Sequence, residues 1–77
     1  MAENISNRPL DSLNDARGKR IIVELKNGKE YVGKLEAFDI HINIVLVETE
    51  EHENKELQRK MGRVFVRGDT ITMISLQ

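Results

Sequence analysis

Residues 20–38 read RIIVELKNGKEYVGKLEAF, and the fold class follows from this stretch. In its first part, Ile21, Val23 and Leu25 alternate with more polar residues, which is the period of a strand with one buried face. Residues 26–29 then predict a hairpin turn, because Asn-Gly tolerates the positive φ angles that tight hairpins require.

The rest of the stretch predicts a second strand that bends. Tyr31, Leu35 and Ala37 continue the alternation, and Gly33 lies among them. A glycine inside a strand indicates a sharp bend or the close approach of another backbone, as where a sheet curls into a barrel.

Three further strands are expected downstream. The run from Ile40 to Leu46 has apolar residues at its even positions and predicts a third strand with one apolar face. Residues 64–66 and 71–76 predict a fourth and a fifth strand, joined by a tight turn at Gly68. Five short strands with tight turns indicate an all-β fold, a closed or nearly closed antiparallel barrel.

A short helix is expected before the first strand, over residues 8–18. Pro9 suits the first helical turn, Asn7 is the expected cap, and Gly18 can supply a left-handed stop. Two or three turns would not persist alone in water, so the helix must pack against the sheet.

Two polar segments carry no strand pattern. Residues 1–8 are expected to form a flexible N-terminal tail, which leaves residues 9–77 as the domain. Residues 48–60 are rich in charge and lack apolar periodicity, so we expect a solvated loop or a hairpin tip there.

Composition limits the class of protein. The 77 residues form one domain, which buries only ~60 % of the surface of its unfolded chain, so association with further copies would add stability. No cysteine is present to form a disulfide or a thiolate metal site, and no apolar run could span a bilayer. These features predict a soluble, cytoplasmic protein.

The charge balance excludes a broadly basic nucleic-acid binder. Net charge is −1, from 12 basic and 13 acidic residues, and the aromatic residues are Tyr31, Phe38 and Phe65. If nucleic acid is the ligand, its site must therefore be local and built from a few well-placed groups.

An enzyme is not expected. The two histidines, His41 and His52, have no second histidine at metal-ligand spacing, and the chain has no phosphate-binding glycine loop. Glutamates near His52 offer a conceivable cation site, but a flexible acidic loop rarely holds a defined geometry. We therefore predict no catalytic residue, no metal and no cofactor.

The first candidate binding segment is Asp39-Ile40-His41-Ile42-Asn43. One interpretation is a polar turn in which Asp39 accepts hydrogen bonds from backbone amides and His41 is simply exposed. The other is a base pocket, because an imidazole can stack on a base and an amide offers a donor and an acceptor to its edge.

The second candidate segment is Arg67-Gly68-Asp69. It can be a plain turn with a solvated arginine, yet guanidinium is also a stacking plane and a forked phosphate donor. If this turn lies beside residues 39–43, His41 and Arg67 could enclose a base while Asn43 reads its edge. The strand pattern alone does not show that the two segments meet.

At these two segments the chain resembles the Sm-like (LSm) family, and within it the archaeal members. The residues that match the first Sm motif are Gly18, Val23, Leu25, Gly28, Gly33, Leu35, Phe38, Asp39, His41, Asn43 and Leu46. Those that match the second are Gly62, Val64, Val66, Arg67, Gly68, Asp69, Ile71 and Ile74. The related bacterial Hfq has Lys-His in place of Arg67-Gly68, which argues against that branch.

The resemblance implies a fold, a ligand and an assembly. The fold is a strongly bent five-stranded antiparallel barrel (the Sm fold) with an N-terminal helix. The assembly is a homo-oligomeric ring formed by pairing the fourth and fifth strands of neighbours, a heptamer as in most archaeal members, although six-membered rings exist. The ligand is single-stranded, uridine-rich RNA, bound in RNA processing or ribonucleoprotein assembly, with RNA-processing proteins as further partners. The implied RNA-binding residues are His41, Asn43, Arg67, Asp39, Gly68 and Asp69.

The resemblance also implies a role for each residue: His41 and Arg67 stack on uracil, Asn43 bonds its edge, Asp39 orients Asn43, and Asp69 supports the pocket. Two alternatives share a small barrel but differ in function. A structural or protein-binding module would show no preference for uridine over adenosine, and a lone OB-type single-strand binder would be a monomer.

Overall fold

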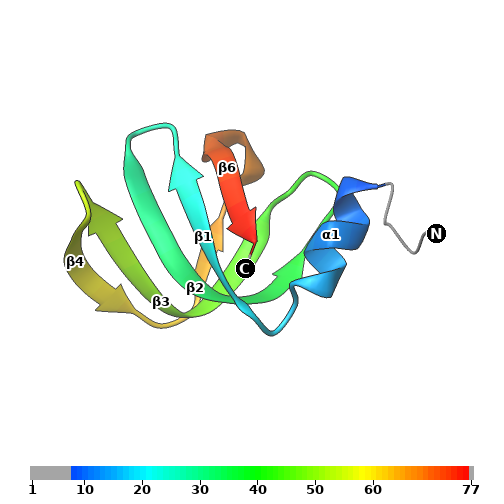
Figure 1. Cartoon of the computed structure of the whole chain (residues 1–77), viewed down its shortest axis with the longest axis horizontal. Coiled ribbons are helices and arrows are strands. Elements are labelled where there is room, and N and C mark those ends of the chain that lie inside the picture. Colours follow the sequence, from blue (N-terminus) through cyan, green and yellow to red (C-terminus); the bar gives the residue numbers. More distant parts are fainter. Residues whose placement is uncertain (1–7, 77) are drawn as a thin grey trace, which may run out of the picture.

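The computed structural model describes residues 8–76, which form one short helix and a curled six-stranded sheet (Figure 1). The elements in order are α1 Pro9–Asp15, β1 Arg20–Leu25, β2 Lys29–Phe38, β3 Ile44–Glu53, β4 Glu56–Met61, β5 Val64–Val66, a 3₁₀ turn Gly68–Thr70, and β6 Ile71–Leu76. Within this described part, no helix is long and apolar enough to cross a membrane.

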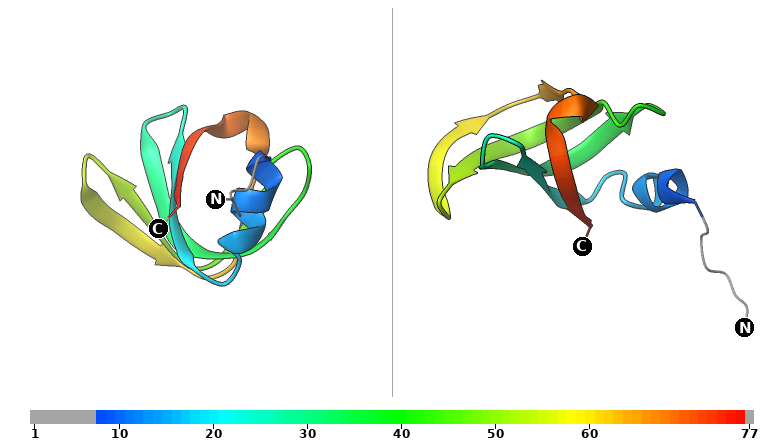
Figure 2. Two further views of the ribbon diagram at one scale, coloured as in Figure 1. Left: turned by 45° about the vertical axis from the view of Figure 1, so that its right-hand side comes forward. Right: turned by 90° about the horizontal axis from the view of Figure 1, so that it is seen from above.

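The sheet is antiparallel throughout and its strands run in the order β4-β3-β2-β1-β6, with β5 also paired to β3. Figure 2 shows how it curls around an interior, with α1 close to its open side. The predicted all-β fold with a short N-terminal helix and a strongly bent sheet is confirmed. The structure has six strands where five were predicted, because β4 forms within the segment expected to be a solvated loop or a hairpin tip.

The interior of the curl holds the core. Ile21 and Val23 of β1, Leu35 of β2, and Ile44 and Leu46 of β3 are all 0 % exposed. The predicted alternation points inward at Ile21, Val23, Leu25 and Leu35, but Ala37 is exposed, because the register of β2 with β3 shifts between Leu35 and Ala37. Leu13 of α1 joins the same cluster. Burying these aliphatic side chains is the main stabilising contribution to the subunit.

The second strand bends at Gly33, as predicted. The register between β2 and β3 shifts between Val32 and Lys34, and a Cβ built on Gly33 would lie 3.0 Å from Thr49 Oγ1. It would also lie 3.1 Å from the carbonyl oxygen of Val47. Because β3 passes so close, a side chain at Gly33 would push the two strands apart.

The N-terminal helix is shorter than predicted. It ends at Asp15, and its cap position is held by Arg8, which makes no side-chain capping bond. The predicted cap, Asn7, and the rest of the predicted tail up to residue 7 lie outside the described residues. Gly18 has φ +83°, as expected of a left-handed residue after a helix, and its N–H donates to the carbonyl of Leu35 at 2.8 Å.

The hairpin between β1 and β2 forms at the predicted Asn-Gly turn. Gly28 adopts the positive φ, +90°, and donates its N–H to the carbonyl of Leu25 at 3.0 Å. The side chain of Asn27 instead accepts a 3.0 Å bond from the N–H of Lys29. The turn is therefore a three-residue loop in which glycine alone supplies the left-handed conformation.

Residues 48–60 belong to a long hairpin; of the two forms predicted for this segment, a solvated loop or a hairpin tip, it is the hairpin that forms. Strand β3 continues to Glu53, and β4 returns along it from Glu56. Asn54 and Lys55 connect them with φ of 54° and 67°, the pattern of a two-residue type I′ turn.

Polar residues on the inner face explain why no apolar pattern marks this hairpin. Thr49 is 1 % exposed and Glu51 is 5 % exposed. Glu51 Oε1 lies 3.2 Å from Arg59 Nε, and its Oε2 lies 3.6 Å from Lys29 Nζ. Two cations, one from β4 and one from β2, thus compensate a carboxylate where an apolar side chain would be expected.

We expect Gly33→Val to lower the midpoint of thermal unfolding by several degrees, because overpacking at such a site costs about 1–3 kcal/mol. Gly62→Val is the matched control, since a Cβ there meets nothing within 4 Å. Both variants are compared with the native chain by circular dichroism at one subunit concentration. Equal midpoints for the two variants would contradict the close approach at Gly33.

Candidate nucleic-acid interface

The loop of residues 39–43, between β2 and β3, is organised by one carboxylate. Asp39 Oδ1 accepts hydrogen bonds from the backbone N–H groups of His41 at 2.8 Å and Asn43 at 3.1 Å. The N–H of Ile42 donates to the carbonyl of Asp39 at 3.0 Å, and Ile42 takes a positive φ of 62°. The 39–43 loop is therefore a compact turn held from inside by its first residue.

Because of this turn, the third strand starts later than the sequence predicted. Strand β3 begins at Ile44, so Ile40 does not share its apolar face and is 73 % exposed. The even-numbered alternation fails because the bonds to Asp39 fold the backbone before the strand starts. Asp39 and Asn43 do lie together, as predicted, but a turn and not a strand face brings them there.

The amide of Asn43 joins the two candidate segments. Its Nδ2 donates to Asp39 Oδ2 at 3.0 Å, and its Oδ1 accepts from the N–H of Gly68 at 2.8 Å. The reverse orientation of the amide would set its NH₂ group against the N–H of Gly68, so these partners determine which way it faces. One N–H and one lone pair of the amide remain available for a ligand.

Gly68 is needed because the two segments meet backbone to backbone. A Cβ at this position would collide with the carbonyl oxygen of His41 and lie 2.9 Å from that of Ile42. The pairing of Ile44 with Val66 brings β3 and β5 together immediately beside this contact. Residues 39–43 and 67–70 therefore form one continuous surface, which the strand pattern alone could not show.

Arg67 and Asp69 flank this contact on the exposed side. Arg67 Nη2 lies 3.2 Å from Asp69 Oδ2, with the two side chains 72 % and 66 % exposed. The carbonyl of Arg67 accepts from Thr70 Oγ1 at 2.7 Å, which holds the turn. An ion pair this exposed contributes little to stability, so both side chains are free to rearrange around a ligand.

A third turn, which the sequence reasoning missed, reaches the same place. The backbone N–H of Lys26 donates to the carbonyl of Thr70 at 2.8 Å, so the turn of residues 26–28 lies beside the Arg67 turn. The Lys26 side chain is exposed and forms no ion pair or hydrogen bond with any of residues 8–76. In the sequence, residues 26–29 predicted only a hairpin turn, and nothing in them indicated a contact with Thr70.

The predicted site residues thus divide into two groups. Asp39, Asn43 and Gly68 form one hydrogen-bonded unit. His41, Arg67 and Asp69 are exposed on the two loops that this unit joins. The hydrogen bond from the Asn43 side chain lowers the pKa of Asp39 below its ordinary value of 3.8, so the carboxylate is ionised at neutral pH.

The described residues offer no metal centre. No group of three or more His, Cys, Asp or Glu among residues 8–76 is arranged to hold an ion. His52 lies on β3, away from the loops, with its Nε2 3.0 Å from Glu50 Oε1. The hydrogen bond from His52 lowers the pKa of Glu50.

Comparison with known proteins identifies the family. The family model described as the LSM domain matches residues 11–76. The chain belongs to the LSM domain family. An snRNP Sm-like protein of Archaeoglobus fulgidus is 48% identical over 68 residues, which cover 88% of this chain and 88% of that protein.

Solved structures of this LSM family share the fold. The Pyrococcus abyssii Sm protein in complex with a uridine heptamer has a TM-score of 0.89 and 37% identity, over 92% of this chain and 100% of that one. A heptameric archaeal Sm protein has a TM-score of 0.81 and 34% identity, over 87% of this chain and 97% of that one.

We expect the stabilising effect of Asp39 to depend on pH. Its lowered pKa means that the ionised form favours the folded state above pH 3.8 and that this contribution is lost as pH falls through the folded pKa. Asp39→Asn should therefore lower the midpoint of thermal unfolding at neutral pH, and in acid its midpoint should approach that of the native chain. Asp15→Asn, an exposed change on α1, should show no such convergence. A constant gap between Asp39→Asn and the native chain at all pH values would contradict the role of the charge.

Proposed function

We propose that this protein binds single-stranded, uridine-rich RNA at the surface formed by residues 39–43 and 67–70. We propose further that it acts as a ring of seven identical subunits in the cytoplasm, in RNA processing or ribonucleoprotein assembly. The observation that carries the proposal is the Asn43 amide, held in one orientation between Asp39 and the Gly68 N–H. The solved complex of a related Sm protein with a uridine heptamer supports the choice of ligand.

The orientation of the Asn43 amide suits uracil. Its remaining lone pair on Oδ1 can accept the N3–H of uracil, and its remaining Nδ2–H can donate to a neighbouring carbonyl oxygen of the base. Cytosine presents an acceptor at N3 and a donor at N4, so it would oppose like groups. Because the carboxylate of Asp39 prevents the amide from turning over, this difference is preserved.

Stacking supplies most of the affinity for each base in this proposal. His41 and Arg67 are exposed on the two loops that the Asn43–Gly68 bond joins, and each carries a flat group that can stack on a base. Stacking of one base is worth about 1–3 kcal/mol, which alone gives weak binding. Repetition around a ring raises the affinity for a longer strand, because adjacent pockets are filled at high effective concentration.

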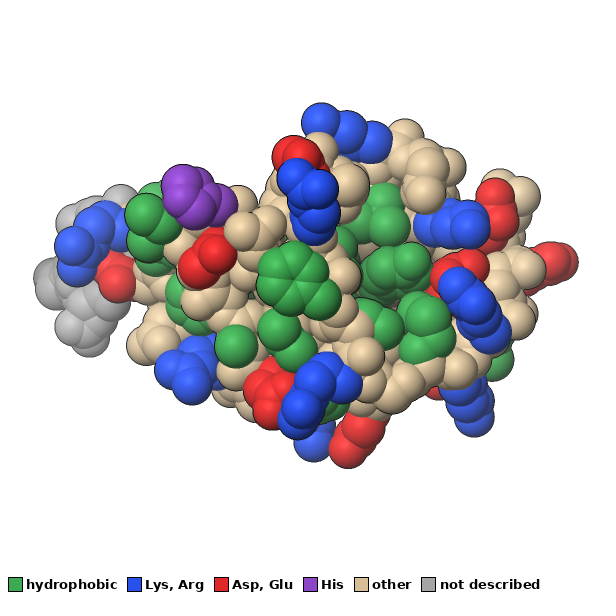
Figure 3. Space-filling view, turned by 180° about the vertical axis from the view of Figure 1, so that it is seen from behind, with side chains coloured by type: hydrophobic (Ala, Val, Ile, Leu, Met, Phe, Trp, Pro, Cys, Tyr) green, Lys and Arg blue, Asp and Glu red, His purple; other side chains and the backbone are tan. Residues whose placement is uncertain are grey.

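The phosphate groups of the RNA need a cation, which the predicted site residues do not provide. Asp39 and Asp69 bring two carboxylates to the site against the single guanidinium of Arg67, to which this proposal assigns stacking on the base. On the face drawn in Figure 3, charges of both signs surround a central apolar area without a continuous basic patch. We therefore assign the unpaired ammonium of Lys26, on the adjoining 26–28 turn, to the RNA backbone.

The ring is supported by the apolar side chains on the edges of the sheet. Phe65 of β5 is 66% exposed, and Met73 and Leu76 of β6 are 51% and 38% exposed. Large apolar groups on an unpaired edge are a liability for a monomer. Pairing β5 of one subunit with β6 of the next would bury them and satisfy both edges, and the heptameric state of a related archaeal Sm protein supports a ring.

We expect oligouridine to bind the native ring more tightly than oligoadenosine does. Arg67→Ala removes a stacking plane and a charge from every pocket and should abolish detectable binding. Asn43→Ala leaves the stack but removes the edge contact, so it should cost selectivity more than affinity. Titrations of both oligonucleotides against the three proteins measure this.

The ring must be intact in each protein, which native mass spectrometry establishes beforehand. A native chain that remains monomeric at micromolar concentration would contradict the assembly. Equal affinity of the native ring for the two oligonucleotides would favour a structural or protein-binding module without base selectivity.

The role of Lys26 is tested through salt. Lys26→Gln should weaken oligouridine binding and reduce the dependence of log K on log salt by about 0.7 for each occupied pocket, with the preference for uridine unchanged. Lys55→Gln, at the tip of the β3–β4 hairpin, is the control for net charge. If the slope of log K against log salt were the same for Lys26→Gln and the native chain, the assignment of Lys26 to the RNA backbone would be contradicted.

A further inference from the structure

The Asn27–Gly28 pair, in the turn between β1 and β2, is chemically labile. The backbone nitrogen of the residue after an asparagine can attack the side-chain amide, and a glycine there has no side chain to hinder the attack. Residues 26–28 are all exposed, and a Cβ built on Gly28 would meet nothing within 4 Å. Neither the fold nor a side chain therefore shields the reacting atoms from solvent.

The side chain of Asn27 is folded over the residue that would attack it. Its Oδ1 accepts the N–H of Lys29 at 3.0 Å, a bond that spans the intervening Gly28. The same bond polarises the side-chain carbonyl and makes its carbon more open to attack. The N–H of Gly28 opposes the reaction, because it donates to the carbonyl of Leu25 at 3.0 Å. The nitrogen becomes available whenever this exposed turn opens.

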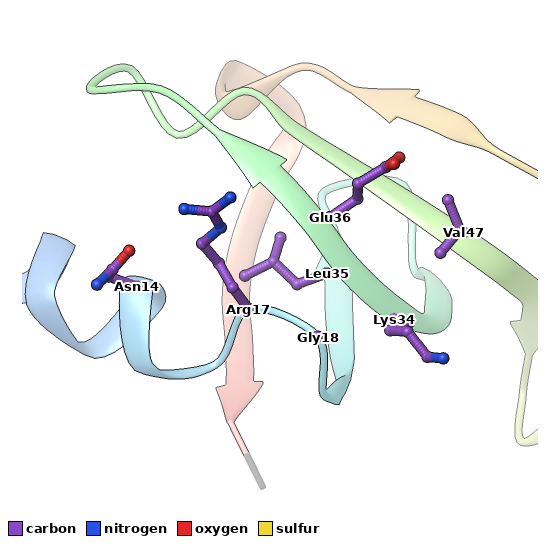
Figure 4. Close-up of a pocket in the computed structure, with 7 residues that line it drawn as sticks. All are labelled: Asn14, Arg17, Gly18, Lys34, Leu35, Glu36 and Val47. Atoms are coloured by element: carbon purple, nitrogen blue, oxygen red, sulfur yellow. The ribbon is translucent and has the colours of Figure 1, made fainter.

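The other described asparagines lack this combination. Asn43 has both atoms of its amide in hydrogen bonds and is followed by a buried, β-branched residue. Asn14 lies in the helical backbone of α1, beside the groove drawn in Figure 4. Asn54 is exposed, but a lysine follows it in place of glycine. Among residues 8–76, the structure thus singles out Asn27.

The charges around the turn determine what a carboxylate at position 27 would do. Of the two lysines that flank Asn27, Lys29 is half-buried and its Nζ lies 3.6 Å from Glu51 Oε2. Lys26 is exposed and forms no ion pair or hydrogen bond with any of residues 8–76. A new carboxylate beside it would therefore pair with Lys26.

We propose that Asn27 is a site of spontaneous deamidation, and that the carboxylate formed there takes Lys26 from the phosphates of bound RNA. The second part rests on the RNA-binding function proposed above. The N–H of Lys26 donates to the carbonyl of Thr70, so the modified turn lies beside the Arg67 turn. The modification adds a negative charge at the margin of the RNA surface and occupies the cation assigned to the RNA backbone.

The reaction needs only water as a second reactant. The Gly28 nitrogen gives up its proton to solvent and forms a bond to Asn27 Cγ. The bond from Cγ to Nδ2 breaks, and the amide nitrogen takes a proton from solvent and leaves as ammonia. Water then opens the cyclic imide at either carbonyl. Breaking the new bond leaves an aspartate at position 27, whereas breaking the original peptide bond leaves an isoaspartate, and both products carry a carboxylate in place of the amide.

The modification is tested on the full chain in its assembled state, by mass spectrometry of its peptides after incubation in mildly alkaline buffer. The peptide that contains Asn27 should gain one dalton. The gain should be slower in mildly acidic buffer, because the Gly28 nitrogen must lose its proton. Asn54 is the internal reference, and its peptide should stay unmodified while half of Asn27 reacts. Equal rates at the two sites, or no gain at Asn27, would overturn the proposal.

The consequence for RNA is tested with two variants that make the same charge change. Asn27→Asp reproduces one product, and Asn54→Asp places its carboxylate at the tip of the β3–β4 hairpin. Asn27→Asp should weaken oligouridine binding about twofold to fivefold for each occupied pocket, as one exposed ion pair allows, and Asn54→Asp should leave it near native. In a Lys26→Gln background, Asn27→Asp should have little further effect, because its partner is gone.

An equal loss of oligouridine affinity in Asn27→Asp and Asn54→Asp, or the same loss from Asn27→Asp with and without Lys26, would overturn the proposed effect on RNA. A native ring that fails to bind oligouridine would contradict the proposed RNA function itself. The mass measurement does not involve RNA, so it decides separately whether Asn27 is modified.

Discussion

The hydrogen-bonded chain from the Asp39 carboxylate through the Asn43 amide to the Gly68 N–H is the interaction on which the functional surface depends. It connects the 39–43 loop, between β2 and β3, to the turn after β5, which is distant from that loop in sequence. Each partner is an obligatory donor or acceptor, so loss of any one leaves another unsatisfied at a partly buried place. The orientation of a single amide thereby depends on two loops that meet in the fold and not on its own loop alone.

Much of this architecture could be predicted from residues 20–38, because an aliphatic alternation with a glycine inside it has few structural solutions. The β3–β4 hairpin could not, since its inward positions carry Thr49 and Glu51 and imitate a solvated segment. The start of the third strand was predicted wrongly for the opposite reason. Ile40 is apolar and has the spacing of a strand's buried face, and yet it is exposed. Periodicity shows only which side chains are apolar. At these two places, the ion pairs of Glu51 and the hydrogen bonds to Asp39 determined which side chains are buried.

The candidate site was predictable as two segments but not as one surface. Asp39 with Asn43, and Arg67 with Asp69, are neighbours in sequence, so their local pairings follow from turn chemistry. The approach of Gly68 to His41 is a contact between backbones, and its only trace in the sequence is a missing side chain. The bond from Lys26 to Thr70 leaves no trace at all, because any residue but proline supplies that N–H.

The carboxylate of Glu51, enclosed by Lys29 and Arg59, has a consequence for how the far end of the sheet responds to its surroundings. The stability that a hairpin gains from burying apolar side chains decreases on cooling. The free-energy cost of removing charged groups from water decreases on heating, which favours an ion-paired hairpin at high temperature. Ionic strength acts on the charged cluster and scarcely on an aliphatic core. The β3–β4 end of the subunit is therefore more sensitive to salt than the barrel it extends, and comparatively tolerant of heat.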